Sequence, residues 1–139
     1  MAVWLAAGGG ALAQDTSTGH AQAVEGDRLQ VNGRVVRLHG LIAPALKDPG
    51  GAEARDLLER VVAGWVVTCH RIGVQRNGLM VAGCEARGRD IGALAVEAGA
   101  ARDCPAESRG RYREQEARAP VDGPGRRAPL PPECVVRSR

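Results

Sequence analysis

The chain has 139 residues, enough for one domain and too few for a TIM barrel or a nucleotide enzyme with a separate substrate domain. Its aromatic residues are Trp4, Trp65 and Tyr112, which argues for an aliphatic core and against a platform that stacks nucleic-acid bases. There are 19 basic and 16 acidic residues, and residues 102–139 hold nine of the basic and six of the acidic ones. The charge excess of +3 therefore lies in the C-terminal third, and it is too small for a nucleic-acid-binding tail.

The chain begins with an uncharged segment of small and apolar residues that ends in Ala11-Leu12-Ala13. This ending fits the cleavage pattern of a secretory signal peptide, so residues 1–13 are predicted to be one, with part of its start missing. The alternative is the frayed start of a chain that is not exported. The apolar run is shorter than the roughly 20 residues that span a bilayer, so no membrane span is expected. Residues 14–20 are polar and are predicted to form a disordered leader.

Three strands are predicted next, around Ala23-Val24, over residues 28–31 and over residues 34–39. Asn32-Gly33 is the hairpin turn between the second and the third. A loop over residues 40–51 then leads to a helix predicted over residues 52–63. The apolar face of this helix follows the i, i+3, i+4 spacing and consists of Ala54, Leu57, Leu58, Val61 and Val62.

Two more strands, over residues 65–70 and 79–85, form a predicted hairpin around the turn signal Arg76-Asn77-Gly78. If residues 75–78 are the loop, Val74 lies opposite Leu79. Counting back along both strands then places Cys69 opposite Cys84, within reach of a disulfide bond.

The chain contains four cysteines. With Cys69 and Cys84 paired, elimination leaves Cys104 to pair with Cys134. An even number of cysteines in a small domain fits an oxidising compartment, so the protein is predicted to be periplasmic or secreted. The alternative, four free thiols, stays open at this point.

The last elements are a short helix that Asp90 caps and Gly99 ends, and a charged helix over residues 108–119. Residues 120–139 form a proline-rich tail that returns to bring Cys134 to its partner. Five strands with a helix after the third favour an α+β, mainly β fold, a five-stranded Greek-key barrel of the OB type with about three helices. We expect the barrel domain to span residues 21–119.

Several motifs occur in the order that is typical of one family. Val24-Glu25-Gly26-Asp27 is followed by the run VRLHGLIAP over residues 36–44, then by Asn77-Gly78 with Val81-Ala82 and Cys84, and by Arg111-Tyr112. Over roughly residues 22–119 the chain resembles the staphylococcal nuclease (thermonuclease) family. The resemblance implies an OB barrel with three helices, in agreement with the pattern of strands and helices.

The resemblance also implies calcium-dependent cleavage of DNA and RNA phosphodiesters. Asp27 matches the family's first metal-binding aspartate, and Arg37 matches its first phosphate-binding arginine. The other functional positions are replaced. Ile42 stands in place of the second metal aspartate, Ala45 in place of the general-base glutamate, and Leu79 in place of the second phosphate arginine.

These replacements predict a catalytically degenerate member that acts, if at all, as a binding or structural module. One missing base costs about 10²–10⁴ in rate and one missing transition-state donor about 10²–10³. The alternative is an active calcium-dependent phosphodiesterase with a rearranged site, into which Asp48, Glu53 or Arg76 has moved. A third reading is a chain that folds but has no selected role.

The retained residues also have structural interpretations. Asp27 can serve as a turn residue, and Arg37 as the ion-pair partner of Glu25 or Asp27. Expected partners are nucleic acid or another anionic ligand, bound weakly, and a protein partner is left open. An apolar mouth made by Ile42, Ala45 and Leu79 would instead suit a peptide or lipid-like ligand. Calcium is expected only if the chain is active, and the chain is expected to be a monomer.

Overall fold

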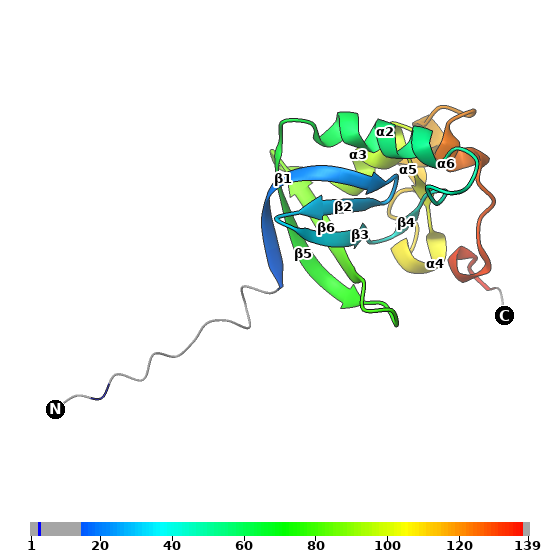
Figure 1. Ribbon diagram of the computed structural model, residues 1–139. Coiled ribbons are helices and arrows are strands. Elements are labelled where there is room, and N and C mark those ends of the chain that lie inside the picture. Colours follow the sequence, from blue (N-terminus) through cyan, green and yellow to red (C-terminus); the bar gives the residue numbers. More distant parts are fainter. Residues whose placement is uncertain (1–2, 4–14, 138–139) are drawn as a thin grey trace.

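The computed structural model describes residue 3 and residues 15–137. Five strands close into a mixed barrel in the order β3-β2-β1-β5-β6, with β3 and β6 joined in parallel (Figure 1). The strands are β1 (Thr16–Glu25), β2 (Arg28–Val31), β3 (Arg34–Leu38), β5 (Val66–Val74) and β6 (Met80–Ala86). The predicted α+β, mainly β barrel is therefore confirmed.

Three short strands and several short helices complete the described part of the chain. β4 (Leu41–Ile42) pairs with β8 (Arg102–Asp103), and β7 (Arg89–Asp90) extends the sheet beyond β6. The helices are α2 (Gly51–Val62), α3 (Ile91–Glu97), α4 (Pro105–Ser108), α5 (Arg113–Arg118) and α6 (Pro124–Arg127), followed by the 3-10 turn η1 (Pro132–Cys134). None of these helices is both long and apolar enough to cross a bilayer.

The barrel core is aliphatic, as the scarcity of aromatic residues requires. Leu29, Val36 and Leu38 are fully or almost fully buried inside it. Helix α2 lies across one end of the barrel, next to β1, and buries Leu58 and Val62 there (Figure 1). Burial of such side chains contributes roughly 1.5–3 kcal/mol each to folding.

The helix predicted over residues 108–119 is divided into α4 and α5. Arg109 and Gly110 both have positive φ angles, 58° and 81°, which no residue of a right-handed helix adopts. The tail beyond residue 119 is also more structured than predicted, because Pro124 and Pro132 each begin a short helical turn. Proline favours the first turn of a helix, since its missing N–H would have no partner there.

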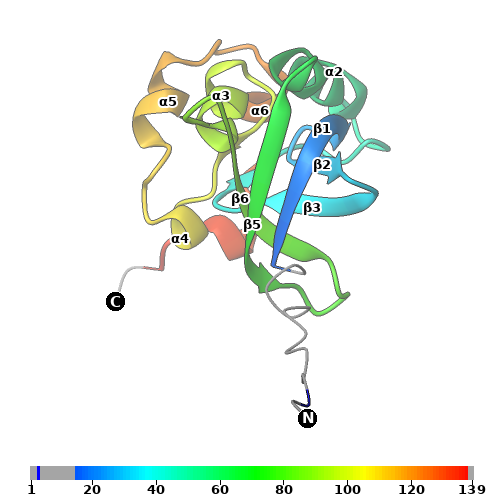
Figure 2. The same ribbon diagram turned by 90° about the vertical axis from the view of Figure 1, so that its left-hand side faces the viewer.

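The disordered leader predicted over residues 14–20 is wrong for residues 16–20. Thr16 to His20 form the first half of β1 and pair with β5, as Figure 2 shows. The sequence of this half-strand is polar, because its one buried residue is Ser17. Its exposed threonines contact polar side chains on β5, and the hydroxyl oxygens of Thr18 and Thr68 lie 3.1 Å apart. The pattern of apolar residues therefore gave no sign of a strand. The signal peptide predicted over residues 1–13, apart from Val3, and residue 14 lie outside the described residues.

The hairpin of β5 and β6 places Cys69 directly opposite Cys84, the register that the sequence predicts. The pairing at the turn differs, because Val74 lies opposite Met80 and not opposite Leu79. A one-residue irregularity between Arg71 and Gly73 compensates for this shift. The structure contains the disulfide bonds Cys69–Cys84 and Cys104–Cys134, the same pairs that the hairpin register and elimination give.

Gly26 is the packing position that allows the β1–β2 turn to sit against the rest of the molecule. A Cβ atom there would lie 2.5 Å from the Ala100 carbonyl oxygen and 2.8 Å from the Cβ atoms of Ala43 and Ala54. These neighbours are backbone or short side chains, so they cannot move aside easily.

We predict that Gly26→Ala lowers the free energy of unfolding by about 1–3 kcal/mol, measured by urea denaturation, because the added methyl overpacks this contact. Gly73→Ala is the matched control, since Gly73 has no atom within 4 Å of an added Cβ and lies in a strand. Equal stability of Gly26→Ala and the wild type would contradict the close packing of this turn.

Candidate functional site

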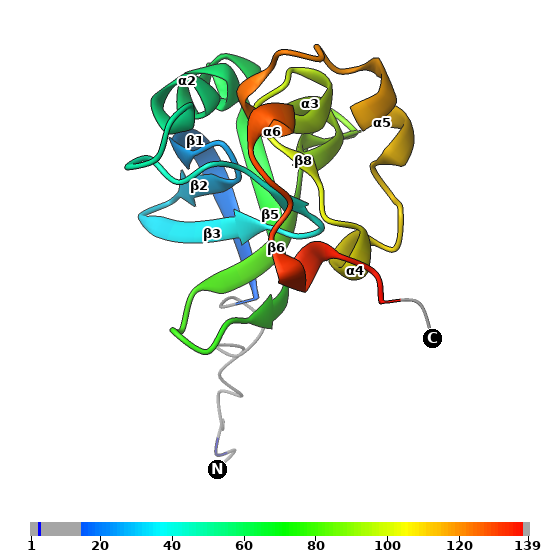
Figure 3. The same ribbon diagram turned by 90° about the vertical axis from the view of Figure 1, so that its right-hand side faces the viewer.

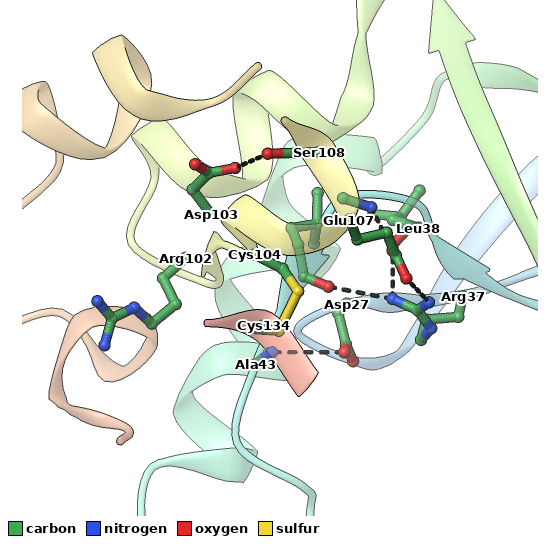
Figure 4. The surroundings of a disulfide bond; sticks show 12 residues. Asp27, Arg37, Leu38, Ala43, Arg102, Asp103, Cys104, Glu107, Ser108 and Cys134 are labelled. Carbon is green, nitrogen blue, oxygen red and sulfur yellow. Dashed lines mark hydrogen bonds and ion pairs between the residues drawn. A yellow bond between two sulfur atoms is a disulfide. The ribbon is translucent and has the colours of Figure 1, made fainter. Parts of the chain in front are cut away.

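Two predicted site residues, Asp27 and Arg37, meet at one end of the barrel, which we call the barrel mouth. Asp27 lies in the turn after β1, Arg37 lies on β3, and Glu107 comes from α4 (Figure 4). Together with the disulfide Cys104–Cys134, they line a cavity of about 300 Å³. The structure thus brings together the two positions, Asp27 and Arg37, for which the sequence predicts a shared site.

Asp27 is buried, with 4% of its surface exposed. Its Oδ2 accepts a hydrogen bond of 3.3 Å from the Ala43 N–H, whereas its Oδ1 has no hydrogen-bond partner among the described residues. Burial raises the pKa of Asp27 from 3.8 to about 6, although Arg28 and Arg37 pull this pKa down. The turn therefore holds the Asp27 carboxyl group in surroundings that disfavour its charged form.

Arg37 forms its ion pair with Glu107. Among the described residues it forms none with Glu25 or Asp27, the partners that its structural interpretation names. Its Nη2 lies 2.6 Å from Glu107 Oε2, and its Nη1 donates to the carbonyl oxygens of Leu38 and Leu41 at 3.4 and 3.3 Å. The Arg37 side chain is 12% exposed. Both terminal nitrogens of the guanidinium thus have partners within the protein.

Each carboxylate oxygen of Glu107 accepts a hydrogen bond. Its Oε1 accepts the Gly40 N–H at 2.6 Å, while its Oε2 receives Arg37. Burial raises the pKa of Glu107, but the hydrogen bonds from Arg37 and the Gly40 N–H and the charge of Arg37 outweigh burial, so the pKa is lowered overall. The ion pair therefore stays charged near neutral pH.

The C-terminal segment forms part of the wall of the mouth. Figure 3 shows this segment running from α6 past the barrel to η1, which lies beside α4. Cys104 immediately precedes α4 and Cys134 ends η1, so their disulfide joins the helix that carries Glu107 to the turn that carries Glu133. Glu133 and Cys134 both line the cavity. Residues 124–137 therefore run past the mouth and supply part of its wall, and we call them the C-terminal strap.

The structure places only two of the three replaced positions at the mouth. Ile42 and Ala45 line the cavity, and they also border an apolar cleft of about 590 Å³ beside it. Leu79 lies at the β5–β6 turn and lines neither space. Two of the three positions thus make the mouth partly apolar, as the sequence predicts, and the third does not contribute.

The residues suggested as substitutes do not line the cavity. Asp48 borders the apolar cleft, Glu53 pairs with Arg127 at 2.6 Å, and Arg76 is exposed at the hairpin turn. The charged lining residues that the sequence analysis missed are Arg28, Glu107 and Glu133. The signal that points to the two glutamates is their position near the two cysteines of one disulfide, which brings both toward the mouth.

Calcium requires six to eight oxygen ligands, usually including several carboxylates. In residues 15–137, no three His, Cys, Asp or Glu side chains are placed so that they could hold a metal ion together. One oxygen of Asp27 already accepts a backbone hydrogen bond, and both oxygens of Glu107 are occupied. This donor set falls short of a calcium site.

No protein-family model matches the sequence, and no curated protein matches it either. The resemblance to the thermonuclease family therefore remains a prediction that rests on the sequence motifs.

The raised pKa of Asp27 predicts a pH dependence of stability. Between about pH 4 and pH 6 the unfolded chain loses the Asp27 proton while the folded chain keeps it, so stability falls as the pH rises through that range. Above about pH 6 both states are ionised at Asp27, and the loss of stability stays constant. The Asp27→Asn variant cannot ionise and retains an oxygen that accepts the Ala43 N–H. We expect it to be more stable than the wild type at pH 8 by up to about 3 kcal/mol and to lose this advantage near pH 3.5.

Thermal unfolding across this pH range measures the effect. Asp48→Asn, at an exposed position, is the matched control and should gain no stability at pH 8. An Asp27→Asn variant that is less stable than the wild type at pH 8 would show that the charged carboxylate stabilises the turn.

Proposed function

We propose that this chain is an exported, disulfide-stabilised barrel module, related to thermonucleases, that binds a partner and does not hydrolyse phosphodiesters. The observation that carries the proposal is the ion pair of Arg37 with Glu107, at 2.6 Å. This ion pair occupies Arg37, the residue of the mouth that the motif assigns to phosphate binding.

Phosphoryl chemistry needs cationic donors that are free to meet the charge developing on the phosphate. The terminal nitrogens of Arg37 instead donate to a carboxylate and to two carbonyl oxygens. A phosphate that approached Arg37 would also approach Glu107, whose lowered pKa keeps it negative. Repulsion between these two anions opposes substrate binding at the position where catalysis would occur.

Activation of the attacking water is equally poorly supported. Ala45 stands where the family has its general base, and it offers no titratable group. Asp27 is buried and hydrogen-bonded to the Ala43 N–H. Losses of this kind are not additive within one site, yet each costs about 10²–10⁴ in rate.

The alternative remains an active calcium-dependent phosphodiesterase. The observation that favours it is Oδ1 of Asp27, which has no hydrogen-bond partner in the described part of the chain. Asp27 lines the cavity together with Glu25 and Glu133. This alternative requires Glu107 to release Arg37 and the C-terminal strap to move aside when the substrate binds.

The proposed compartment is the periplasm or the extracellular space. Two disulfide bonds within residues 15–137 are typical of proteins that fold under oxidising conditions. The Ala11-Leu12-Ala13 sequence supports export by a signal peptide.

A nuclease assay on the oxidised protein tests the proposal. Heat-denatured DNA is incubated with the protein in calcium, in magnesium or in chelator, and Asp27→Ala is assayed beside the wild type. We expect no metal-dependent cleavage by either protein when circular dichroism shows that both are folded. Calcium-dependent cleavage that disappears in Asp27→Ala would support the alternative and overturn the proposal.

A further inference from the structure

A second charged surface lies beyond the barrel mouth and shares no lining residue with it. It is a groove of about 420 Å³ between the α4–α5 segment and the end of the C-terminal strap. One side is formed by residues 105, 106, 109, 110 and 113, and the other by residues 135–137. We call it the arginine groove, because Arg109, Arg113 and Arg137 line it and are all exposed.

The three arginines have no ion-pair partner within residues 15–137. No acidic residue lines the groove. The Arg113 side chain lies against the α4–α5 side of the groove. Its Nη2 atom is 3.0 Å from the position that a Cβ atom on Gly110 would occupy. The groove is thus a concave surface with three positive charges and no internal anion, in the C-terminal third where the chain's charge excess lies.

The opposite wall offers apolar surface and open backbone groups. Val135 and Val136 are 47% and 64% exposed. Val135 has extended φ and ψ angles of −84° and 126°. Within the described residues, Val136 and Arg137 make no backbone hydrogen bond. An extended segment of this kind can pair with another extended chain, which is the basis of β-strand addition.

We propose that the arginine groove binds an extended acidic peptide segment of a partner protein. Carboxylates of the peptide would meet the three guanidinium groups, which form strong, geometrically specific pairs with carboxylates. The peptide backbone would pair with residues 136–137, and an apolar side chain would pack on Val135 and Val136. This inference names a partner class for the proposed binding module, but it uses a different surface from the barrel mouth.

Two other anionic partners fit the groove less well. Proteins that bind single-stranded nucleic acid usually stack its bases on aromatic side chains, and the groove contains no aromatic residue. A membrane surface would cover an apolar, projecting face, whereas this surface is a groove with two walls and an open backbone edge. Both are alternatives that the binding experiment can separate.

The experiment measures fluorescence anisotropy of a labelled Glu-Val-Glu-Val-Glu-Val-Glu peptide titrated with the oxidised full chain. Two triple variants carry the same loss of charge. One is Arg109→Gln/Arg113→Gln/Arg137→Gln, and the other is Arg60→Gln/Arg76→Gln/Arg89→Gln, at exposed positions outside the groove. We expect the first to weaken binding by at least about tenfold and the second by less than about twofold. Val136→Pro, which removes one backbone N–H, should also weaken binding.

Equal losses in the two triple variants would show attraction by net charge alone and overturn the proposal. Absence of peptide binding by the wild type would overturn it as well. Tighter binding of oligothymidylate or of phosphatidylglycerol vesicles than of the peptide would assign the groove to nucleic acid or to a membrane. Because the groove shares no residue with the mouth, none of these outcomes depends on the nuclease assay.

Discussion

A guanidinium that is largely withdrawn from water needs an anion beside it, and in this chain Glu107 supplies the anion for Arg37. This ion pair fixes α4 against β3 and β4 at the barrel mouth. The disulfide Cys104–Cys134 acts at the same place, since it ties the start of α4 to η1 and thereby holds the C-terminal strap at the wall of the cavity. The charge of the mouth and the position of the strap beside it therefore depend on one short helix.

The barrel could be predicted from the sequence because its signals are local. The turn residues Asn32-Gly33 and the spacing of apolar residues within α2 identify neighbouring elements directly. The first half of β1 could not be predicted in this way, because its partner strand lies some fifty residues later and its buried residue is Ser17. The division of the last helix was also hidden, since Arg109 is an unusual residue at a positive φ.

The site was only partly predictable for a related reason. Asp27 and Arg37 stand in motifs, so their proximity could be expected before the structure was known. Glu107 comes to Arg37 from seventy residues away, and no periodicity or motif connects the two. A motif identifies the residues that a family shares, but it does not show that another residue has neutralised one of them.

The central claim is that Glu107 keeps Arg37 from binding anions, and titration with inorganic phosphate by calorimetry tests it most directly. We predict that Glu107→Gln binds phosphate at least about tenfold more tightly than the wild type and that adding Arg37→Gln removes the gain. Glu53→Gln, which frees Arg127 from an exposed pair, is the matched control and should show a smaller gain. Wild-type binding as tight as that of Glu107→Gln, and lost in Arg37→Gln, would contradict the account.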